Sequence, residues 1–341
     1  MRERLWAFVH EECIPAEESV EAFLSAAGHP GEATRFAVVP PVIEALKERA
    51  RDLGLWNVWA DEHMCHLAAG RATDDAGPCG VSLRRDIEAQ LPAEPLTVSE
   101  YALLAEIMGR SELAALACNC SAPDTGNMEL LSRFATPGQA RRWLLPLLQG
   151  RMRSAFLMTE PDVASSDARN IACAIAVSDD GARATVSGRK WWATGACHPQ
   201  CGLFLVLGVS DAGARPTRRH SIALVPASAP GVRDVTPLLV FGYDDAPAGH
   251  ASVTLDALSG IKVFVPRVAL AVMDRAIQVH GGTGVEGRGL LARAYAGMRC
   301  LRIADGPDDV HERTLAGLEA RRVLGAAGAR EAVTGRRPAK L

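Results

Sequence analysis

The hydrophobic period of this 341-residue chain changes twice, and this change limits the possible folds more than any other feature of the sequence. Helical spacing dominates the first part, short strands with turn-rich spacers begin at Arg153, and the helical period returns at Ile261. Strands that follow one another without intervening helices are typical of an antiparallel sheet. We therefore predict an α+β protein with three domains: helical over 1–152, antiparallel β over 153–258 and helical over 259–341.

The N-terminal domain contains several recognisable helix starts and ends. Prolines in a first turn, hydroxyl N-caps and closing glycines predict helices at 35–59, from Ser99 to Gly109, and from Thr136 towards Gly150. Between Asp61 and Pro95 the period fades and turn residues take over. We expect this stretch to be a surface insertion.

The middle of the chain favours one β-hairpin and several further strands. Residues 171–177 and 184–188 are predicted to pair across the polar turn Asp179-Asp180-Gly181. Other short apolar runs predict strands at 203–207, 221–225 and 252–255. Together these strands are expected to form the sheet of the middle domain.

The charge balance argues against some classes of partner. The chain has 37 Lys and Arg against 40 Asp and Glu, a formal charge of −3, which disfavours a nucleic-acid groove or a basic membrane patch. No apolar run approaches the roughly 18 residues of a membrane span, and Glu11 and Glu12 are incompatible with a secretory signal. Nine scattered cysteines then indicate reduced thiols. We expect a soluble intracellular protein, cytoplasmic if bacterial, with an organelle also possible if eukaryotic.

Two stretches carry the residues most suggestive of ligand binding. Residues 158–167 run from a strand end into small and hydroxyl residues, which could contact a planar cofactor or a phosphate; a polar turn that caps a strand explains them equally well. Residues 188–196 contain the adjacent Trp191 and Trp192 in a chain with 5% aromatic residues. These tryptophans could cover a flat ring, or they could be core residues on opposite faces of a strand.

Four further segments complete a family pattern, at 105–111, 120–129, 240–247 and 276–284. With 158–167 and 188–196 they resemble the acyl-CoA dehydrogenases, most of all the branch also found as the dehydrogenase module of larger fused proteins. The resemblance covers nearly the whole chain. It implies a barrel-like middle β domain and a C-terminal helical bundle, which agrees with the helical, β, helical order derived above.

The resemblance assigns roles to individual residues. It implies that residues from three segments bind FAD: Phe156, Met158, Thr159, Trp192, Thr194, Gln278, Gly281 and Gly282. The Thr159 hydroxyl would lie near the ring nitrogens. Ser166 matches the serine that meets the acyl-CoA substrate. Because the segment from Gln278 to Gly282 matches one that approaches the FAD of a neighbouring subunit, a homo-oligomer is implied. By itself, Gly281-Gly282 would only indicate a helix end.

The implied reaction needs a carboxylate base. The family removes the α-proton of a thioester while the β-hydride passes to the flavin, so the base must lie near the α-carbon. Most members use a glutamate followed by glycine, and here 304–311 occupies that place, which makes Asp305 the candidate base. The alternative is a structural turn, since Asp-Gly is common in turns.

Two short clusters of cysteine and histidine are possible metal sites. Residues 63–66 and 197–201 contain metal-ligand types at short spacing, but neither forms a four-ligand zinc pattern. Cys118 and Cys120 follow an apolar helical context and are interpreted as packing residues. No metal is predicted.

The sequence departs from the family pattern after Asp256. The family has a linker and two long antiparallel helices here, whereas this chain passes directly into the segment that begins at Ile261. Two such helices would comprise on the order of 60–100 residues. We therefore expect a shortened C-terminal bundle.

The resemblance implies a function in fatty acid β-oxidation. We expect FAD-dependent oxidation of a fatty acyl-CoA to its trans-2-enoyl-CoA, with electrons passing to an electron-transfer flavoprotein by family analogy. The alternative is a catalytically impaired member of the family that acts as a CoA-ligand-binding or interaction protein. Retained flavin in the purified protein would distinguish the two.

Overall fold

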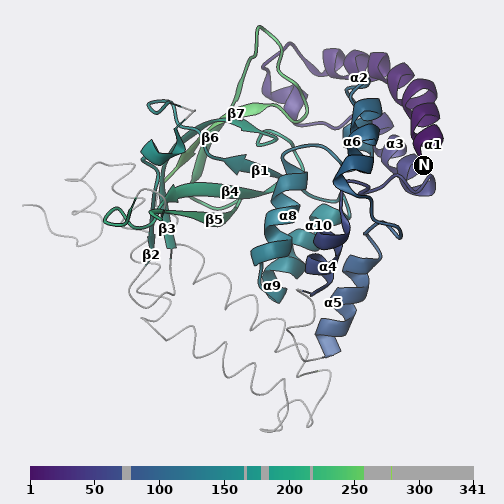
Figure 1. Ribbon diagram of the computed structural model, residues 1–341. Coiled ribbons are helices and arrows are strands. Elements are labelled where there is room, and N and C mark those ends of the chain that lie inside the picture. Colours follow the sequence, from purple (N-terminus) through teal and green to yellow (C-terminus); the bar gives the residue numbers. More distant parts are fainter. Residues whose placement is uncertain (71–77, 165–166, 178–183, 216–217, 257–277, 279–341) are drawn as a thin grey trace, which may run out of the picture. The chain divides into compact units, whose positions relative to one another are not determined.

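The computed structural model describes most of the chain up to Asp256 (Figure 1). The described residues are 1–70, 78–164, 167–177, 184–215, 218–256 and 278. Most of them belong to one compact unit, made of Met1–Cys173, Gly188–Ser228 and Val232–Thr254. A second unit includes Ala174–Ser187 and therefore the hairpin of the sheet. The predicted helical domain over 259–341 lies outside the described residues apart from Gln278, which is helical and exposed.

Helices dominate the described residues before Gly150, as predicted. In chain order the helical segments are α1 (Arg2–Ala7), the π-helical η1 (Phe8–Cys13), α2 (Ile14–Ala27), the 3₁₀ turn η2 (Ala33–Phe36), α3 (Pro41–Asp52), α4 (Glu62–Gly70), α5 (Pro78–Glu88), α6 (Val98–Met108), α7 (Ala114–Ala117), α8 (Asp124–Phe134), α9 (Pro137–Gln139), the π-helical η3 (Ala140–Leu144) and α10 (Leu145–Leu148). The predicted helix at 35–59 is therefore shorter than expected: α3 begins at the second proline and ends just before Gly54.

Two threonines cap helices in this part of the chain. The Thr136 hydroxyl accepts the Gln139 N–H, and the Gln139 side chain accepts the Thr136 N–H, so the predicted start at Thr136 is confirmed. The same reciprocal pair joins Thr97 and Glu100 at the start of α6. The predicted N-cap Ser99 is therefore wrong by two residues, because Thr97 is the residue with a glutamate three positions later.

The surface insertion predicted between Asp61 and Pro95 is also wrong. Helices α4 and α5 lie in this stretch, and Met64, Leu83 and Ile87 are buried in a hydrophobic cluster with α8, α10 and β4. The carboxylate of Asp61 accepts the Met64 N–H at 2.7 Å and so begins α4. Both helices are short, at 9 and 11 residues, so each offers few turns in which a helical period could be recognised.

The strands after Arg153 belong to a seven-stranded sheet. Its strands are β1 (Arg153–Leu157), β2 (Ala174–Val177), β3 (Ala184–Thr194), β4 (Cys201–Val209), β5 (His220–Pro226), β6 (Val232–Leu238) and β7 (His250–Leu255), with the 3₁₀ turn η4 (Ala168–Asn170) between β1 and β2. The predicted hairpin is confirmed, since β2 and β3 pair antiparallel with Ala174 opposite Ser187. Strand β5 likewise pairs antiparallel with β4. Strand β7 lies between β3 and β6.

The sheet is mixed, so the prediction of a purely antiparallel domain is wrong. Strand β1 runs parallel to β4, with Ala155 opposite Phe204. Short spacers predict antiparallel neighbours only for consecutive strands, and the β2–β3 hairpin separates β1 from β4 in sequence. Strand β6 was not predicted because none of its residues is fully buried and it includes Pro237.

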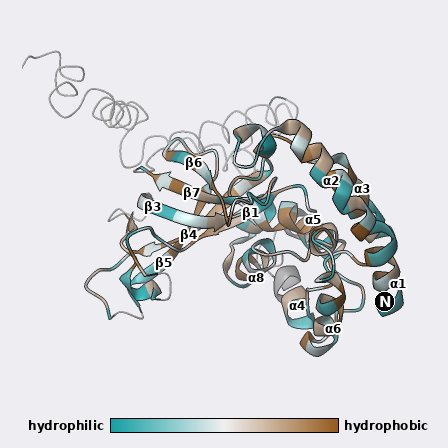
Figure 2. Ribbon diagram, turned by 90° about the horizontal axis from the view of Figure 1, so that it is seen from above, coloured by the Kyte–Doolittle hydropathy of each residue, from teal (hydrophilic) through white to brown (hydrophobic). Residues whose placement is uncertain are grey.

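Hydrophobic residues of the larger unit form two clusters. One gathers apolar side chains of α1, α2, α3, α6 and α7, and helices α2 and α3 in Figure 2 carry both hydrophobic and hydrophilic residues, as this requires. The other joins α8 and α10 to β4 through residues such as Met128, Leu147 and Leu205. Strand β4 is buried from Leu203 to Val206, so it forms a rigid base beside β1.

Candidate functional site

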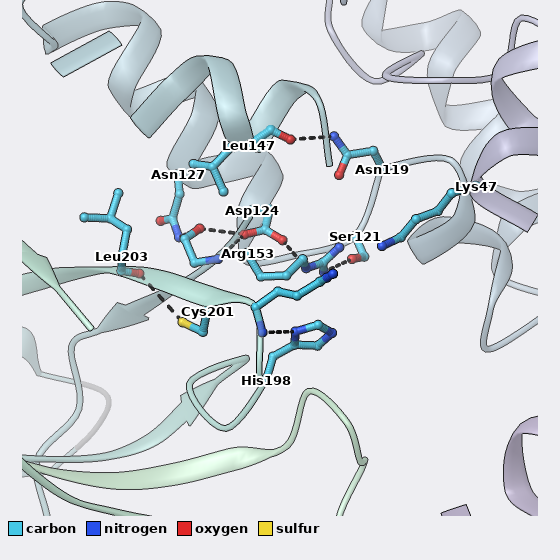
Figure 3. A network of polar contacts seen from close by, with 12 residues as sticks. Lys47, Asn119, Ser121, Asp124, Asn127, Leu147, Arg153, His198, Cys201 and Leu203 are labelled. Carbon is cyan, nitrogen blue, oxygen red and sulfur yellow. Dashed lines mark hydrogen bonds and ion pairs between the residues drawn. The ribbon is translucent and has the colours of Figure 1, made fainter. Parts of the chain in front are cut away.

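A buried ion pair links the start of β1 to α8 (Figure 3). Asp124 begins the helix and is 1% exposed; Arg153 begins the strand, and its Nε lies 2.7 Å from Asp124 Oδ2. The other Asp124 oxygen accepts the N–H of Ser154 at 2.7 Å, and Asn127 donates to the Ser154 hydroxyl at 2.9 Å. These bonds satisfy the buried charges and set the position of β1.

Two further basic side chains surround this ion pair (Figure 3). Lys47 is buried, and burial lowers its pKa although its Nζ lies 2.7 Å from Glu44 Oε1. His198 is 5% exposed, and burial together with the positive charges of Arg153 and Lys47 lowers the pKa of His198 to about 3. Its Nδ1 accepts the N–H of Gln200 at 3.1 Å, which matches a neutral ring.

Strand β1 leads into the Thr159-Glu160-Pro161 turn, which is held by a second buried ion pair. Lys190 on β3 is 0% exposed, and its Nζ donates to Glu160 Oε1 and to the Met158 carbonyl, both at 2.8 Å. Glu160 also accepts the N–H groups of Ala172 and Cys173. Burial opposes the ionisation of Glu160, but the bonds from Lys190 and the two N–H groups outweigh it, so the Glu160 pKa lies below its ordinary value.

The two predicted ligand-binding stretches meet at this turn. The Thr159 hydroxyl donates to the Trp191 carbonyl at 2.6 Å, and the Trp191 N–H donates to the Thr159 carbonyl at 3.1 Å. The indole N–H of Trp191 is buried with no hydrogen-bond partner among the described residues. Trp192 has a φ of 51° and is 41% exposed, so the alternative of two core tryptophans is wrong for Trp192.

A small hollow lies beside the turn. It is lined by Met158, Thr159, Val163, Ala164, Asp167 and Ile171. Phe156, Met158 and Thr159 are half-buried along β1 and its extension, so part of each side chain faces outward. This arrangement offers both apolar surface and a hydroxyl to a ligand at the strand ends.

A third group of contacts lies at the end of β3. The Thr194 hydroxyl lies 2.9 Å from His250 Nδ1, and His250 Nε2 lies 3.0 Å from Asp245 Oδ2. The Trp192 and His250 rings meet edge to face, 6.1 Å between centroids. The loop that carries Asp245 is held by its neighbour Asp244, which accepts two hydrogen bonds from the buried Arg35 at 2.8 and 3.1 Å. 

Burial keeps the cysteines of the clusters 63–66 and 197–201 protonated. Burial raises the pKa of Cys65 to about 11 and that of Cys197 to about 11. Cys118 and Cys120 are buried, as their interpretation as packing residues requires. Within the described ranges, no group of three or more His, Cys, Asp or Glu residues could hold a metal ion. Among the helices of the described ranges, none has the length and apolar character of a membrane span.

Two domain profiles and several relatives match this chain. The profile of the acyl-CoA dehydrogenase middle domain matches residues 155–256, and that of the acyl-CoA dehydrogenase C-terminal domain matches residues 244–318. The chain is 34% identical to "Probable acyl-CoA dehydrogenase FadE2" of Mycobacterium tuberculosis, over 93% of this chain and 94% of the relative. The chain belongs to the acyl-CoA dehydrogenase family. The predicted resemblance is therefore confirmed.

A longer relative and a solved structure also belong to the proteins that resemble this chain. "Probable acyl-CoA dehydrogenase IBR3" of Arabidopsis thaliana is 34% identical, and this chain spans only 46% of that relative. A solved structure from Mycobacterium abscessus, assigned to the acyl-CoA dehydrogenases, is 30% identical with a TM-score of 0.62 over 95% of this chain and 97% of that one. The α+β fold with a mixed sheet is consistent with that family.

The structure thus brings together some predicted site residues and leaves others aside. Thr159 and Trp191 are joined by two hydrogen bonds, so the segments 158–167 and 188–196 meet in the fold. The predicted residues Ser166, Gly281, Gly282 and Asp305 lie outside the described residues.

Sequence reasoning assigned no role to Lys190, Glu160 or His250. For Lys190 a signal was available: alternation from the buried Val186 puts residue 190 on the inner face of β3.

Proposed function

We propose that this chain is an FAD-dependent acyl-CoA dehydrogenase that converts a fatty acyl-CoA to its trans-2-enoyl-CoA. The observation that carries the proposal is its 34% identity to an acyl-CoA dehydrogenase relative across 94% of that relative's length. Bound FAD would supply the hydride acceptor for the β-carbon. Passage of the electrons to an electron-transfer flavoprotein, and a place in fatty acid β-oxidation, are further parts of the proposal.

Several features of the Thr159 turn fit a flavin ring. Trp192 presents an exposed indole, and the Trp191 indole N–H lacks a partner among the residues that the structure describes. The Thr159 hydroxyl uses its proton on the Trp191 carbonyl, so its lone pairs are free to accept a hydrogen bond from a ring N–H. Apolar surface from Phe156 and Met158 lies on the same segment. A flat, partly polar ring would satisfy these groups together.

The proposed roles follow from chemistry and position. Thr159 and Thr194 would orient the ring by hydrogen bonds, while Phe156, Met158 and Trp192 would exclude water from it. The buried pair of Lys190 and Glu160 keeps the Thr159 turn in place, because Lys190 bonds both to Glu160 and to the Met158 carbonyl.

The residues outside the described part complete the proposal. Ser166 would contact the acyl-CoA thioester, and Asp305 would take the α-proton as general base. Gln278 with Gly281 and Gly282 would approach the FAD of a neighbouring subunit, which makes a homo-oligomer part of the proposal.

A second candidate function is supported by the alignment lengths. The alignment with the Mycobacterium tuberculosis relative has 421 positions. It includes 93% of the 341 residues of this chain, which is about 317 residues. About 104 positions, 421 minus 317, therefore have no residue here. A deficit of this size agrees with the expected loss of two helices from the C-terminal bundle. It favours a member that binds a CoA ligand or an interaction partner with impaired catalysis.

Flavin retention separates the two functions. Purified protein is incubated with FAD, passed over a gel-filtration column and examined by absorbance. Retained flavin peaks that bleach on addition of an acyl-CoA would support the dehydrogenase. Colourless protein would contradict it and favour the impaired member.

A substitution then tests the proposed base. Asp305→Asn is expected to abolish acyl-CoA-dependent bleaching while flavin stays bound, because an amide cannot take the α-proton. Asp308→Asn serves as a matched control, since it removes the same charge three positions further along the chain. Bleaching at an unchanged rate in Asp305→Asn would refute the assignment of the base.

A further inference from the structure

The loop between β4 and β5 is rich in positive charge. Residues 210–221 contain Arg215, Arg218, Arg219 and His220 against a single acid, Asp211, although the whole chain has a formal charge of −3. One oxygen of the Asp211 carboxylate accepts two backbone N–H groups of the same loop. This carboxylate therefore stabilises the turn, and the loop keeps a local excess of positive charge.

The three arginines of this loop have no anionic partner among the residues that the structure describes. Arg215 and Arg218 are exposed, and the Nε of Arg219 is shielded from water without a hydrogen-bond partner in the described ranges. By contrast, Arg35 and Arg153 each pair with an aspartate, at 2.8 and 2.7 Å. A shielded guanidinium N–H without an acceptor is unfavourable, so an anion bound here would be stabilised by charge-assisted hydrogen bonds.

The loop leaves the sheet at the same edge as the turn that follows β1. Strands β1 and β4 run parallel, with Leu157 opposite Val206, so the chain leaves both strands in the same direction. Cys173 connects the two segments: its N–H donates to Glu160 Oε1 at 2.9 Å, and its carbonyl accepts the Val209 N–H at 2.7 Å. Figure 1 shows both strands pointing away from α8, with the loop between β4 and β5 beyond their ends.

The arginines lie farther from the sheet than the turn does. A strand advances ~3.3 Å per residue, so Ser210, four residues after Val206, lies roughly 13 Å beyond the level of Leu157. The arginines follow Ser210 in the loop. An acyl-CoA has a matching layout, because its pantetheine arm separates the thioester from a diphosphate and a 3′-phosphate. A thioester at the turn would place these phosphates on the side of the loop.

We propose that Arg218 and Arg219 bind the phosphate groups at the nucleotide end of the acyl-CoA, and that Arg215 strengthens the positive potential around them. The inference rests on the proposed function for the identity of the ligand, and both candidate functions include a CoA ligand. The fork of a guanidinium matches two phosphate oxygens. Because the nucleotide end takes no part in the reaction, these contacts stabilise bound substrate and transition state equally. They lower KM and leave kcat unchanged.

The first experiment measures CoA binding to the full chain by isothermal titration calorimetry. Arg218→Gln combined with Arg219→Gln should weaken CoA binding about tenfold or more, because each change removes a charge-assisted hydrogen bond to phosphate. Arg85→Gln removes an exposed arginine from α5 and is the matched control, which should bind CoA like the parent protein. Parent-like affinity in the double variant, or an equal loss in Arg85→Gln, would overturn the inference.

Two competitors separate the nucleotide from a general anion. The isolated nucleotide end of CoA, 3′-phospho-ADP, should displace CoA from the parent protein and act more weakly on the double variant. Inorganic phosphate should displace CoA only at a far higher concentration, because it offers one phosphate group in place of three. Equal potency of inorganic phosphate and 3′-phospho-ADP would show a general anion site and overturn the assignment to CoA.

Catalysis by FAD-loaded protein supplies a second readout. The double variant should raise KM for an acyl-CoA about tenfold with kcat unchanged, as loss of uniform binding requires. The same acyl group carried on pantetheine lacks the phosphates, so its kinetic constants should be the same in the parent protein and the double variant. A lower kcat, or an equal loss with the acyl-pantetheine, would indicate a disturbed active site and overturn the inference.

The binding experiment distinguishes this inference from the dehydrogenase proposal, because calorimetry with CoA needs no flavin. A parent protein that retains flavin, together with a double variant of unchanged CoA affinity, would overturn the inference and leave the dehydrogenase proposal intact. A colourless parent protein whose CoA binding depends on Arg218 and Arg219 would contradict the dehydrogenase and support the inference in the CoA-binding alternative.

Discussion

Acidification should destabilise this protein through the buried histidine next to the Asp124–Arg153 ion pair. His198 is 5% exposed and faces the positive charges of Arg153 and Lys47, which together with burial lower its pKa from 6.5 to about 3. In the unfolded chain the imidazole takes up a proton near pH 6.5, whereas in the folded protein it resists protonation to about pH 3. Stability is therefore lost as the pH falls below 6.5.

The size of the effect follows from the pKa difference. Each pH unit between the two pKa values changes the free energy of unfolding by about 1.4 kcal/mol, so at pH 5 the loss from His198 is about 2 kcal/mol. For a single domain of ordinary stability this is a large fraction of the total. The loss should appear as a lower urea midpoint, followed by tryptophan fluorescence at pH 7.5 and pH 5.

A substitution isolates the contribution of this one ring. In His198→Asn the amide oxygen can still accept the Gln200 N–H that the ring nitrogen accepts at 3.1 Å, but the side chain no longer titrates. We expect the variant to lose about 2 kcal/mol less than the parent protein between the two pH values. His29→Asn, at an exposed position, is the matched control and should keep the parent slope. Equal slopes for the parent and His198→Asn would refute the reasoning.

Two stability predictions accompany this one. Lys190→Met should lower the free energy of unfolding in urea by about 3–5 kcal/mol, because it leaves the Glu160 carboxylate buried without its cation. Lys190→Met combined with Glu160→Gln should cost less than the sum of the two single changes. A loss below about 1 kcal/mol in Lys190→Met would contradict the role of the pair. Thr97→Ala should lower stability by about 1 kcal/mol, while Ser99→Ala should have little effect. A larger loss of stability in Ser99→Ala than in Thr97→Ala would show that the cap is assigned to the wrong residue.

Sequence reasoning succeeded for the fold where local signals and tertiary structure agree. Pro41 and Gly54 bound α3 because a proline fits the first turn of a helix and a glycine its end. The reasoning failed where the deciding partner lies far along the chain. The parallel pairing of β1 with β4 depends on a crossover that no local period encodes, and the burial of Leu83 and Ile87 depends on helices contributed by later residues.

The candidate site shows the same division. Thr159 and Trp191, which belong to the two family motifs, are in contact in the structure although 32 positions separate them. Residue types alone did not indicate that Lys190 would be buried against Glu160, 30 positions earlier, or that His250 would contact Thr194, 56 positions away. Such contacts depend on strand order rather than on spacing. The roles predicted for Ser166, Gln278 and Asp305 stay predictions.

The bond between Arg35 and Asp244 has a consequence for synthesis of the protein. The two residues are separated by 209 positions, and Arg35 has one of the most completely buried charged side chains of the described part of the chain. At a ribosomal rate of about 5–20 residues per second, Arg35 emerges about 10–40 seconds before its carboxylate partner exists. The N-terminal helices must therefore stay soluble with this guanidinium hydrated. Its burial against Asp244 can follow only after the loop before β7 has been synthesised.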